Sequence, residues 1–205
     1  MKLWIIRHCE TDFNREKRCQ GTIDIPLSEK GLRQAEAVAD YMRRFSLDAV
    51  YSSPSLRAVQ TAQAFAVPLG LPIIKEVGLM ELKQGIFEGC TMEDMMRLDP
   101  QVLQSWIKNP ADTKLPEGEN MRELESRTWE VVEKIRTTCD SQACIAMVSH
   151  NLAISTIICK ILGLDLNMFR KFRISPGGIS QVEFTKVGAV VVSLNETSHL
   201  TDIED

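Results

Sequence analysis

Short apolar runs alternate with longer amphipathic stretches along the chain, and this alternation predicts an α/β fold. The run Leu3–Ile6 is continuously apolar, as expected for a strand that is buried on both faces of a sheet. The other predicted strands are residues 48–52, 143–148, 179–185 and 189–194. Amphipathic stretches predict helices at residues 28–42, 55–66, 120–138 and 151–162. Strands that alternate with helices predict a three-layer α/β/α sandwich with a largely parallel central sheet.

The remaining segments carry weaker signals. Residues 71–90 contain several glycines and are predicted to be irregular. Residues 91–109 have helical character but contain Pro100, which lacks a backbone donor and should split the segment into two short helices. The tail from Thr197 is short and polar, so we expect it to be loose, with His199 in solvent. No repeat or linker divides the chain, so residues 1–205 are predicted to form a single domain.

The composition is that of a globular protein, with 44% hydrophobic and 25% charged residues. A net charge of −4 argues against nucleic acid as a partner, because that surface would need a basic stripe. No apolar run reaches membrane-spanning length, so no membrane partner is expected. The six cysteines show neither a CxxC pair nor zinc-ligand spacing. We interpret them as free thiols in a reducing compartment, and we expect a cytoplasmic protein without a metal site.

Two of the three histidines directly follow predicted buried strands, His8 after the first and His150 after the strand at 143–148. Ligands of open α/β sheets bind beyond the carboxyl ends of the strands, so we expect these two side chains to face each other at that edge. A single histidine there would more simply be a buried imidazole with satisfied hydrogen bonds. Two at equivalent positions, one of them beside Arg7, favour a functional site.

The sequence around these histidines resembles the histidine phosphatase (phosphoglycerate mutase-like) superfamily. Arg7-His8-Cys9-Glu10-Thr11 is similar to the family motif Arg-His-Gly-Glu-Thr. Further blocks follow in the family's order: Asn14, Gln20-Gly21, Asp24-x-Pro26-Leu27-Ser28-x-x-Gly31, Ser53-Pro54-x-x-Arg57-Ala58, Glu81-x-x-x-Gly85-x-x-Glu88-Gly89 and Ser149-His150. The resemblance implies a phosphoglycerate mutase-like α/β/α fold.

The resemblance also implies a catalytic role for each matching residue. Arg7 and Arg57 would clamp a phosphomonoester, which carries about two negative charges near neutral pH. His8 would attack phosphorus through an unprotonated ring nitrogen, which requires an acceptor for its other N–H group. His150 would stabilise the transferring oxygens, and Glu81 would protonate the leaving oxygen and then activate water. The substrate-binding residues implied in the same way are Asn14, Gln20, Gly21 and Asn151.

Cys9 stands where the family carries glycine, and this departure raises a rival interpretation. The spacing from His8-Cys9 to Arg15 matches the signature of cysteine-dependent tyrosine phosphatases, in which a thiolate attacks phosphorus. The residues between them include no glycine that would help backbone amides to wrap around phosphate. The cysteine interpretation also leaves Arg57 and His150 without a role, so we favour His8 as the nucleophile.

The interval between Glu81 and His150 is short and resembles the compact phosphatase branch of the family. We therefore expect a metal-independent phosphomonoesterase, without a cofactor, that acts on a small phosphorylated metabolite through a phosphohistidine on His8. An activity like that of α-ribazole phosphatase is one candidate. A cofactor-dependent phosphoglycerate mutase and a catalytically silent binding protein of the same fold stay open as alternatives.

Residues 90–120 are expected to form a helical cap over the active site. Their apolar side chains are expected to pack the cap against the body of the protein rather than to line the pocket; they are Met92, Met95, Met96, Leu98, Leu103 and Trp106. The oligomeric state, monomer or homodimer, stays open.

Overall fold

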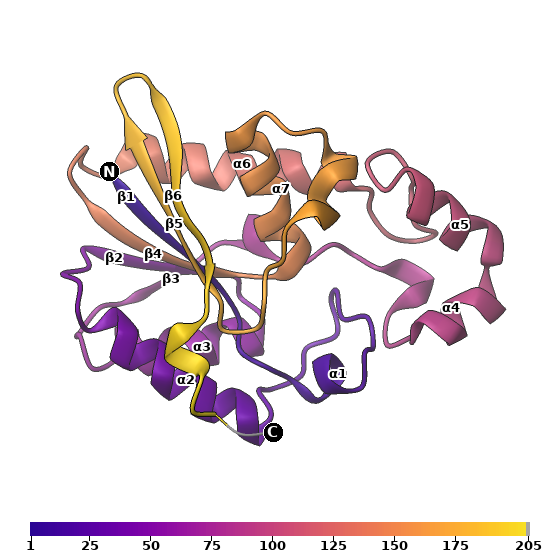
Figure 1. Ribbon diagram of the computed structural model, residues 1–205, viewed down its shortest axis with the longest axis horizontal. Helices are drawn as coiled ribbons and strands as arrows, with labels where there is room; N and C mark the ends of the chain where they lie inside the picture. Colours follow the sequence, from indigo (N-terminus) through magenta and orange to yellow (C-terminus); the bar gives the residue numbers. More distant parts are fainter. Residues whose placement is uncertain (204–205) are drawn as a thin grey trace.

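Six strands form one mixed sheet in the computed structural model, which describes residues 1–203 (Figure 1). The strands are β1 (Lys2–Arg7), β2 (Ala49–Ser52), β3 (Ile73–Lys75), β4 (Cys144–Ser149), β5 (Ile179–Thr185) and β6 (Gly188–Glu196). Their order across the sheet is β3-β2-β4-β1-β5-β6. The first four in this order run parallel, whereas β5 and β6 run antiparallel to their neighbours. The prediction of a largely parallel sheet is confirmed.

Helices cover both faces of this sheet. The helices are α2 (Glu29–Met42) and α3 (Leu56–Ala66) on one face and α6 (Met121–Thr138) and α7 (Asn151–Leu162) on the other. Side chains of a strand alternate between the two faces. Trp4 and Ile6 of β1 accordingly pack against α2 and α3, whereas Leu3 and Ile5 pack against α6 and α7. Both faces of β1 are buried, which explains its uninterrupted apolar run and confirms the three-layer prediction.

The start of α2 is tied to the loop that follows β1. The Ser28 side chain caps the helix by accepting a hydrogen bond from the Gly31 N–H at 3.0 Å. The Ser28 N–H donates to the Glu10 carbonyl at 2.9 Å. A Cβ atom on Gly31 would lie 2.0 Å from that same carbonyl oxygen. Only glycine permits the helix and the loop to approach so closely.

Replacing Gly31 with alanine should therefore displace Glu10, two residues after His8. We expect the free energy of unfolding to fall by about 1–3 kcal/mol, as for other overpacked sites. Urea denaturation measures this change. Stabilisation by the higher helix propensity of alanine, about 1 kcal/mol, would contradict the expectation.

Two short helices lie beyond the sheet, α4 (Met92–Leu98) and α5 (Pro100–Lys108), which we name the outer helices (Figure 1). Pro100 occupies the first turn of α5, and the Asp99 side chain caps that helix by accepting from the Val102 N–H at 3.0 Å. The predicted break at Pro100 is confirmed.

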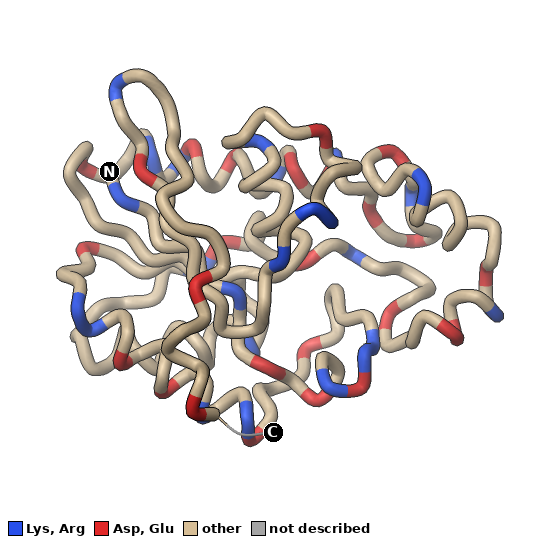
Figure 2. Tube along the Cα trace, viewed as in Figure 1, with Lys and Arg blue, Asp and Glu red and all other residues tan. Residues whose placement is uncertain are grey.

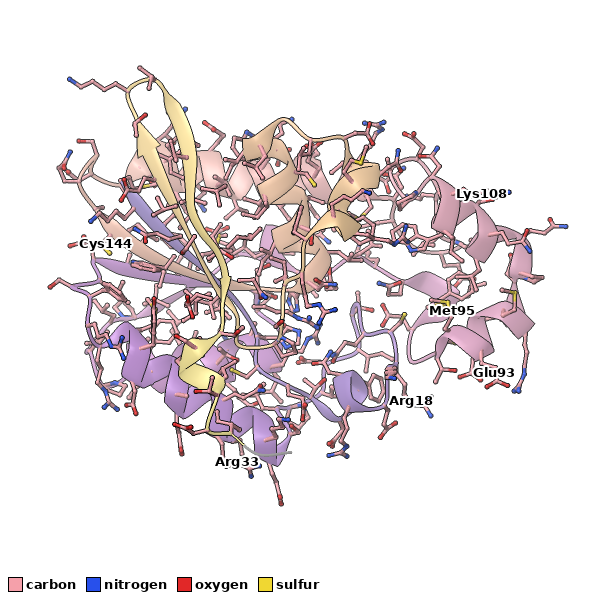
Figure 3. All side chains as sticks on the ribbon, viewed as in Figure 1. Arg18, Arg33, Glu93, Met95, Lys108 and Cys144 are labelled. Atoms are coloured by element: carbon pink, nitrogen blue, oxygen red, sulfur yellow. The ribbon has the colours of Figure 1, made fainter. Side chains whose placement is uncertain are left out.

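Met95 and Leu103 are buried in an apolar cluster, while Glu93 and Lys108 lie at the outer edge (Figure 3). The prediction that the apolar side chains of this segment serve packing is confirmed for Met95 and Leu103 and is wrong for Met92, Met96 and Leu98, which are exposed.

The structure corrects two predictions. Residues 71–90 are not wholly irregular, because they include the three-residue edge strand β3. The tail is not loose up to residue 203, since Ser198–Leu200 form a helical turn that contacts α2. His199 is half-buried there: its Nε2 donates to the Gly177 carbonyl at 3.0 Å, and its ring centroid lies 5.2 Å from that of Tyr41.

Four further short elements had no counterpart in the sequence prediction. They are the single turn α1 (Asp12–Arg15) and the 3-10 helices η1 (Val77–Leu79), η2 (Gly85–Phe87) and η3 (Leu166–Lys171). No helix within residues 1–203 combines the length and the apolar character needed to cross a membrane.

Candidate active site

The carboxyl ends of β1 and β4 bring two histidines together. The strands pair in parallel with Arg7 opposite Ser149, so His8 and His150 leave the sheet side by side. The His8 N–H donates to the Ser149 carbonyl at 2.9 Å. The two imidazole centroids lie 5.0 Å apart, and both side chains are buried. The predicted meeting of these histidines at the sheet edge is observed.

His8 is held in the tautomer that leaves one nitrogen free for attack. Its Nδ1 lies 2.8 Å from the Cys9 carbonyl oxygen. A carbonyl can only accept, so Nδ1 carries the proton and Nε2 keeps its lone pair. Burial, followed by the guanidinium groups of Arg57 and Arg7, holds the pKa of His8 well below its usual value. The ring is therefore neutral near pH 7.

His150 is oriented by two serines at the end of β2. Its Nε2 lies 2.8 Å from the Ser53 hydroxyl and 3.2 Å from the Ser55 hydroxyl. The other ring nitrogen, Nδ1, is buried and has no hydrogen-bond partner among the described residues. Burial, followed by Arg57, lowers the pKa of His150 well below its usual value. His150 is therefore neutral near pH 7, with Nδ1 unpartnered.

Two arginines bring positive charge to the histidines. Arg57 is fully buried, and its Nη1 and Nη2 donate to the carbonyls of Ile23 and Gly21, each at 3.0 Å. Arg7 Nη1 donates to the Ile174 carbonyl at 2.7 Å. Burial lowers the pKa of Arg7 to about 10, which leaves it charged at neutral pH. The Nε atoms of Arg7 and Arg57 are buried without a hydrogen-bond partner in the described part of the chain.

The buried carboxyl group of Glu81 lies at the N-terminus of α7. It accepts from the backbone N–H groups of Leu82 at 2.8 Å, Leu152 at 3.1 Å and Ala153 at 3.3 Å. Burial raises the pKa of Glu81, while these hydrogen bonds and the charges of Arg7 and Arg57 oppose that rise. A carboxyl group with a raised pKa is suited to proton transfer near neutrality.

The cluster has the properties of an anion site. Three nitrogens of the cluster, Arg7 Nε, Arg57 Nε and His150 Nδ1, are buried without a partner in residues 1–203. Buried donors in proteins nearly always have an acceptor. The non-bridging oxygens of a phosphoryl group would supply acceptors beside the free Nε2 of His8. No group of three or more His, Cys, Asp or Glu side chains in the described chain is arranged to hold a metal ion.

Comparison with known proteins agrees with this geometry. The family model of the histidine phosphatase superfamily (branch 1) matches residues 3–197. This chain belongs to that superfamily. Phosphoserine phosphatase 1 of Hydrogenobacter thermophilus is 32% identical over 200 residues, which cover 98% of this chain and 94% of the relative. The probable phosphoglycerate mutase GpmB of Escherichia coli is 30% identical over 205 residues, covering 98% of this chain and 95% of the relative. The crystal structure of a putative alpha-ribazole-5'-P phosphatase from Escherichia coli shares 26% identity with a TM-score of 0.88, over 96% of both chains.

The remaining predicted site residues of this histidine phosphatase lie around the cluster. Asn14 Oδ1 accepts from the Thr11 N–H at 3.2 Å and so caps the single turn α1. Gln20 is buried and bonds the Thr11 hydroxyl at 2.8 Å, while the Gly21 carbonyl holds Arg57. Asn151 is half-buried at the first position of α7. These contacts shape the loop around the arginine, and direct contact with substrate stays a prediction.

Cys9 has the properties of a packing residue in this histidine phosphatase. Its side chain is fully buried, and burial raises its pKa to about 12. A thiol that stays protonated at neutral pH is a poor nucleophile. Arg15, which the tyrosine phosphatase interpretation would need at the phosphate, is exposed on α1 and pairs with Asp12 at 2.9 Å. The structure disfavours that interpretation.

Glu88 has a role that the sequence did not show. Its carboxylate accepts from the backbone N–H groups of Gly21 at 3.0 Å, Thr22 at 2.8 Å and Ile23 at 3.4 Å. The carbonyls of Gly21 and Ile23 in turn hold Arg57. Glu88 therefore positions Arg57 through the loop at 21–23. Its place in the family motif was the only signal in the sequence.

Replacing Glu88 with glutamine should loosen that loop and misplace Arg57. We expect kcat/KM for a phosphomonoester to fall about 10- to 100-fold, the range found for small errors of positioning. Inhibition by inorganic vanadate should weaken together with it. Glu93→Gln, a change at an exposed position of α4, is the control and should leave both values unchanged. Equal kcat/KM for the Glu88 variant and the parent would contradict the assignment.

Proposed function

We propose that this protein hydrolyses a small phosphorylated metabolite through a phosphohistidine on His8. The observation that carries the proposal is the set of buried, unpartnered nitrogens, Arg7 Nε, Arg57 Nε and His150 Nδ1, in the cluster that holds the free Nε2 of His8. In this proposal Asn14, Gln20, Gly21 and Asn151 complete the phosphate-binding surface. The arginines supply the charge that metal ions supply in many phosphoryl-transfer enzymes, so no metal or cofactor takes part.

The first step transfers the phosphoryl group to the enzyme. Arg7, Arg57 and His150 hold the non-bridging oxygens, and the lone pair of His8 Nε2 attacks phosphorus in line with the leaving oxygen. The N–P bond forms as the P–O bond to the alcohol breaks. Glu81 donates its proton to the leaving oxygen, and a neutral alcohol departs. Glu81 is then a carboxylate.

The second step returns the enzyme to its starting state. The Glu81 carboxylate takes a proton from water as the water oxygen attacks phosphorus. The N–P bond breaks, its electron pair returns to Nε2, and inorganic phosphate leaves. Because Glu81 is protonated again and His8 is neutral again, each turnover consumes one water and one phosphomonoester.

The names of the relatives give several kinds of substrate, and the two buried side chains of the outer helices help to choose among them. An apolar pocket built from Met95 and Leu103 would favour a bulky, partly aromatic substrate such as α-ribazole phosphate. Both side chains are instead buried in the protein's own core. We therefore favour a small phosphorylated acid as the substrate. Phosphoserine and phosphoglycerate, which appear in the names of two relatives described above, are of this type.

Four phosphomonoesters test the proposal: O-phosphoserine, 3-phosphoglycerate, α-ribazole 5′-phosphate and p-nitrophenyl phosphate. Release of inorganic phosphate in the presence of EDTA and without an added bisphosphate supports it. Formation of 2-phosphoglycerate that depends on added 2,3-bisphosphoglycerate would make the protein a mutase. A folded protein that hydrolyses none of them would be a binding protein of the same fold.

We further propose a cytoplasmic protein, since all six cysteines are free thiols. The chain would act as one domain with residues 90–120 as its cap, in the form of a monomer or a homodimer. Light scattering on the purified protein measures the oligomeric state.

A further inference from the structure

A cavity of about 510 Å³ adjoins the active site. Arg7 and Asn151 contribute to its wall, and the segment after α7 contributes the rest, including Phe169, Arg170, Phe172 and Arg173. No carboxylate among the described residues lines it. The volume lies within the range of small-molecule sites. The cavity therefore combines a catalytic arginine with two further guanidinium groups.

Those two guanidinium groups lack the acidic partners that other arginines of this protein have. Most surface arginines elsewhere pair with carboxylates, for example Arg122 with Asp112 and Arg136 with Glu133. Arg170 and Arg173 form no ion pair with any described carboxylate. The stretch 166–178 contains no acidic residue, and its basic positions appear in blue in Figure 2. In a chain of net charge −4, this is a local concentration of uncompensated positive charge.

Arg170 and Arg173 are both exposed, and Arg170 is partly fixed in place. Arg170 Nη1 donates to the Ile107 carbonyl of α5 at 3.2 Å, and its guanidinium carbon lies 4.7 Å from the Phe169 ring centroid. This stacking leaves the remaining N–H groups of Arg170 available to a ligand. Arg173 has no hydrogen bond to a described residue that would hold its head group. A guanidinium of this kind can turn toward an anion that enters the cavity.

The same segment holds the catalytic arginine. Arg7 Nη1 donates to the carbonyl of Ile174, the residue next to Arg173, at 2.7 Å. The leaving group of a phosphate ester bound by Arg7 can therefore extend into the cavity that Arg7 itself lines. Asn151, at the first turn of α7, lines the same cavity.

We propose that Arg170 and Arg173 bind a second anionic group, a carboxylate or a phosphate, on the leaving group of the substrate. The assignment rests on the proposed function and specifies its substrate class. The enzyme then selects phosphorylated acids over phosphorylated neutral alcohols of the same size. Arg7 binds the transferring phosphoryl group, and the second pair of arginines binds the far end of the substrate.

Calorimetric titration of the His8→Ala variant, which binds without turnover, tests the proposal. The ligands are 3-phosphoglycerate, glycerol 3-phosphate, which has a neutral hydroxymethyl group in place of the carboxylate, and 2,3-bisphosphoglycerate, which adds a second phosphate. We expect the carboxylate ligand to bind about tenfold or more tightly than glycerol 3-phosphate, as charge-assisted hydrogen bonds predict. Adding Arg173→Gln or Arg170→Gln should reduce this ratio about fivefold or more. Adding Arg136→Gln, which removes a charge from an ion pair on α6, should not change it.

The outcomes separate this inference from the proposed function. The inference would be overturned if glycerol 3-phosphate bound as tightly as both 3-phosphoglycerate and 2,3-bisphosphoglycerate, if neither of those two ligands bound measurably, or if neither arginine variant changed the ratio. A preference shown only by 2,3-bisphosphoglycerate assigns the second group as phosphate, and one shown by both anionic ligands assigns a general anion site. If the parent hydrolyses no phosphomonoester but the selectivity and its arginine dependence are present, the subsite stands and the phosphatase proposal falls.

Discussion

Replacing His8 with alanine is expected to lower kcat for any phosphomonoester by about 10⁴-fold or more, as removal of a nucleophile does in other covalent catalysts. The expectation rests on the hydrogen bond from Nδ1 to the Cys9 carbonyl, which leaves Nε2 as an unprotonated nitrogen at the centre of the site. Steady-state assays with O-phosphoserine and p-nitrophenyl phosphate measure the loss. Circular dichroism and the midpoint of thermal unfolding show that the variant is folded.

Cys9→Ser is the matched control for this experiment. The Cys9 thiol is buried, and its raised pKa of about 12 keeps it protonated at neutral pH. Exchange of sulfur for oxygen places a hydroxyl in an apolar setting and should lower stability, while kcat stays within about tenfold of the parent. An inactive, folded Cys9→Ser enzyme together with an active His8→Ala enzyme would move the nucleophile to the cysteine.

Replacing Glu81 with glutamine is expected to lower kcat for alkyl phosphates by about 10²- to 10⁴-fold, the usual contribution of a general acid–base residue. Glutamine keeps the size of the side chain and can still accept the backbone N–H of Leu82, but it cannot donate a proton to the leaving oxygen. p-Nitrophenol needs little protonation as it leaves, so the phosphorylation step with that substrate should be affected less. Pre-steady-state assays that separate the burst of nitrophenol from later turnover measure this difference.

The Glu81 variant should also change the pH dependence. Burial raises the pKa of this carboxyl group, so the protonated acid persists to higher pH than that of an ordinary glutamic acid. The fraction able to donate a proton falls as pH rises through the raised pKa, which predicts an alkaline limb in kcat for alkyl phosphates. Glutamine does not titrate, and this limb should disappear. An unchanged alkaline limb in Glu81→Gln would assign it to another group.

The sequence predicted the layers and most of the elements of the fold because each carries a strong local pattern. Leu3–Ile6 is apolar on both faces, and Ser28 caps a helix with clear amphipathic spacing. The strand β3 escaped prediction because it is three residues long and lies at the sheet edge. The position of His199 also escaped prediction, since its partners Tyr41 and Gly177 lie far away in the sequence.

The sequence predicted which residues form the candidate site but not the hydrogen bonds that hold them in place. His8 and His150 each follow a buried strand, which predicted that they meet at one edge of the sheet. The resemblance to a family identified Arg57 and Glu81 as further members of the site. No local pattern reveals that Glu88 binds the amides of the loop at 21–23, because that contact spans more than sixty residues. The serines that orient His150 come from a different strand for the same reason.

The central claim is that the phosphoryl group passes through His8, and rapid-quench labelling tests it most directly. The enzyme is mixed with a ³²P-labelled phosphomonoester, quenched in alkali within milliseconds, digested and mapped by mass spectrometry. We predict an acid-labile, alkali-stable phosphoryl group on the peptide that contains His8, strongest in the Glu81→Gln variant with p-nitrophenyl phosphate. A label on Cys9, or full turnover without any labelled protein, would contradict the account.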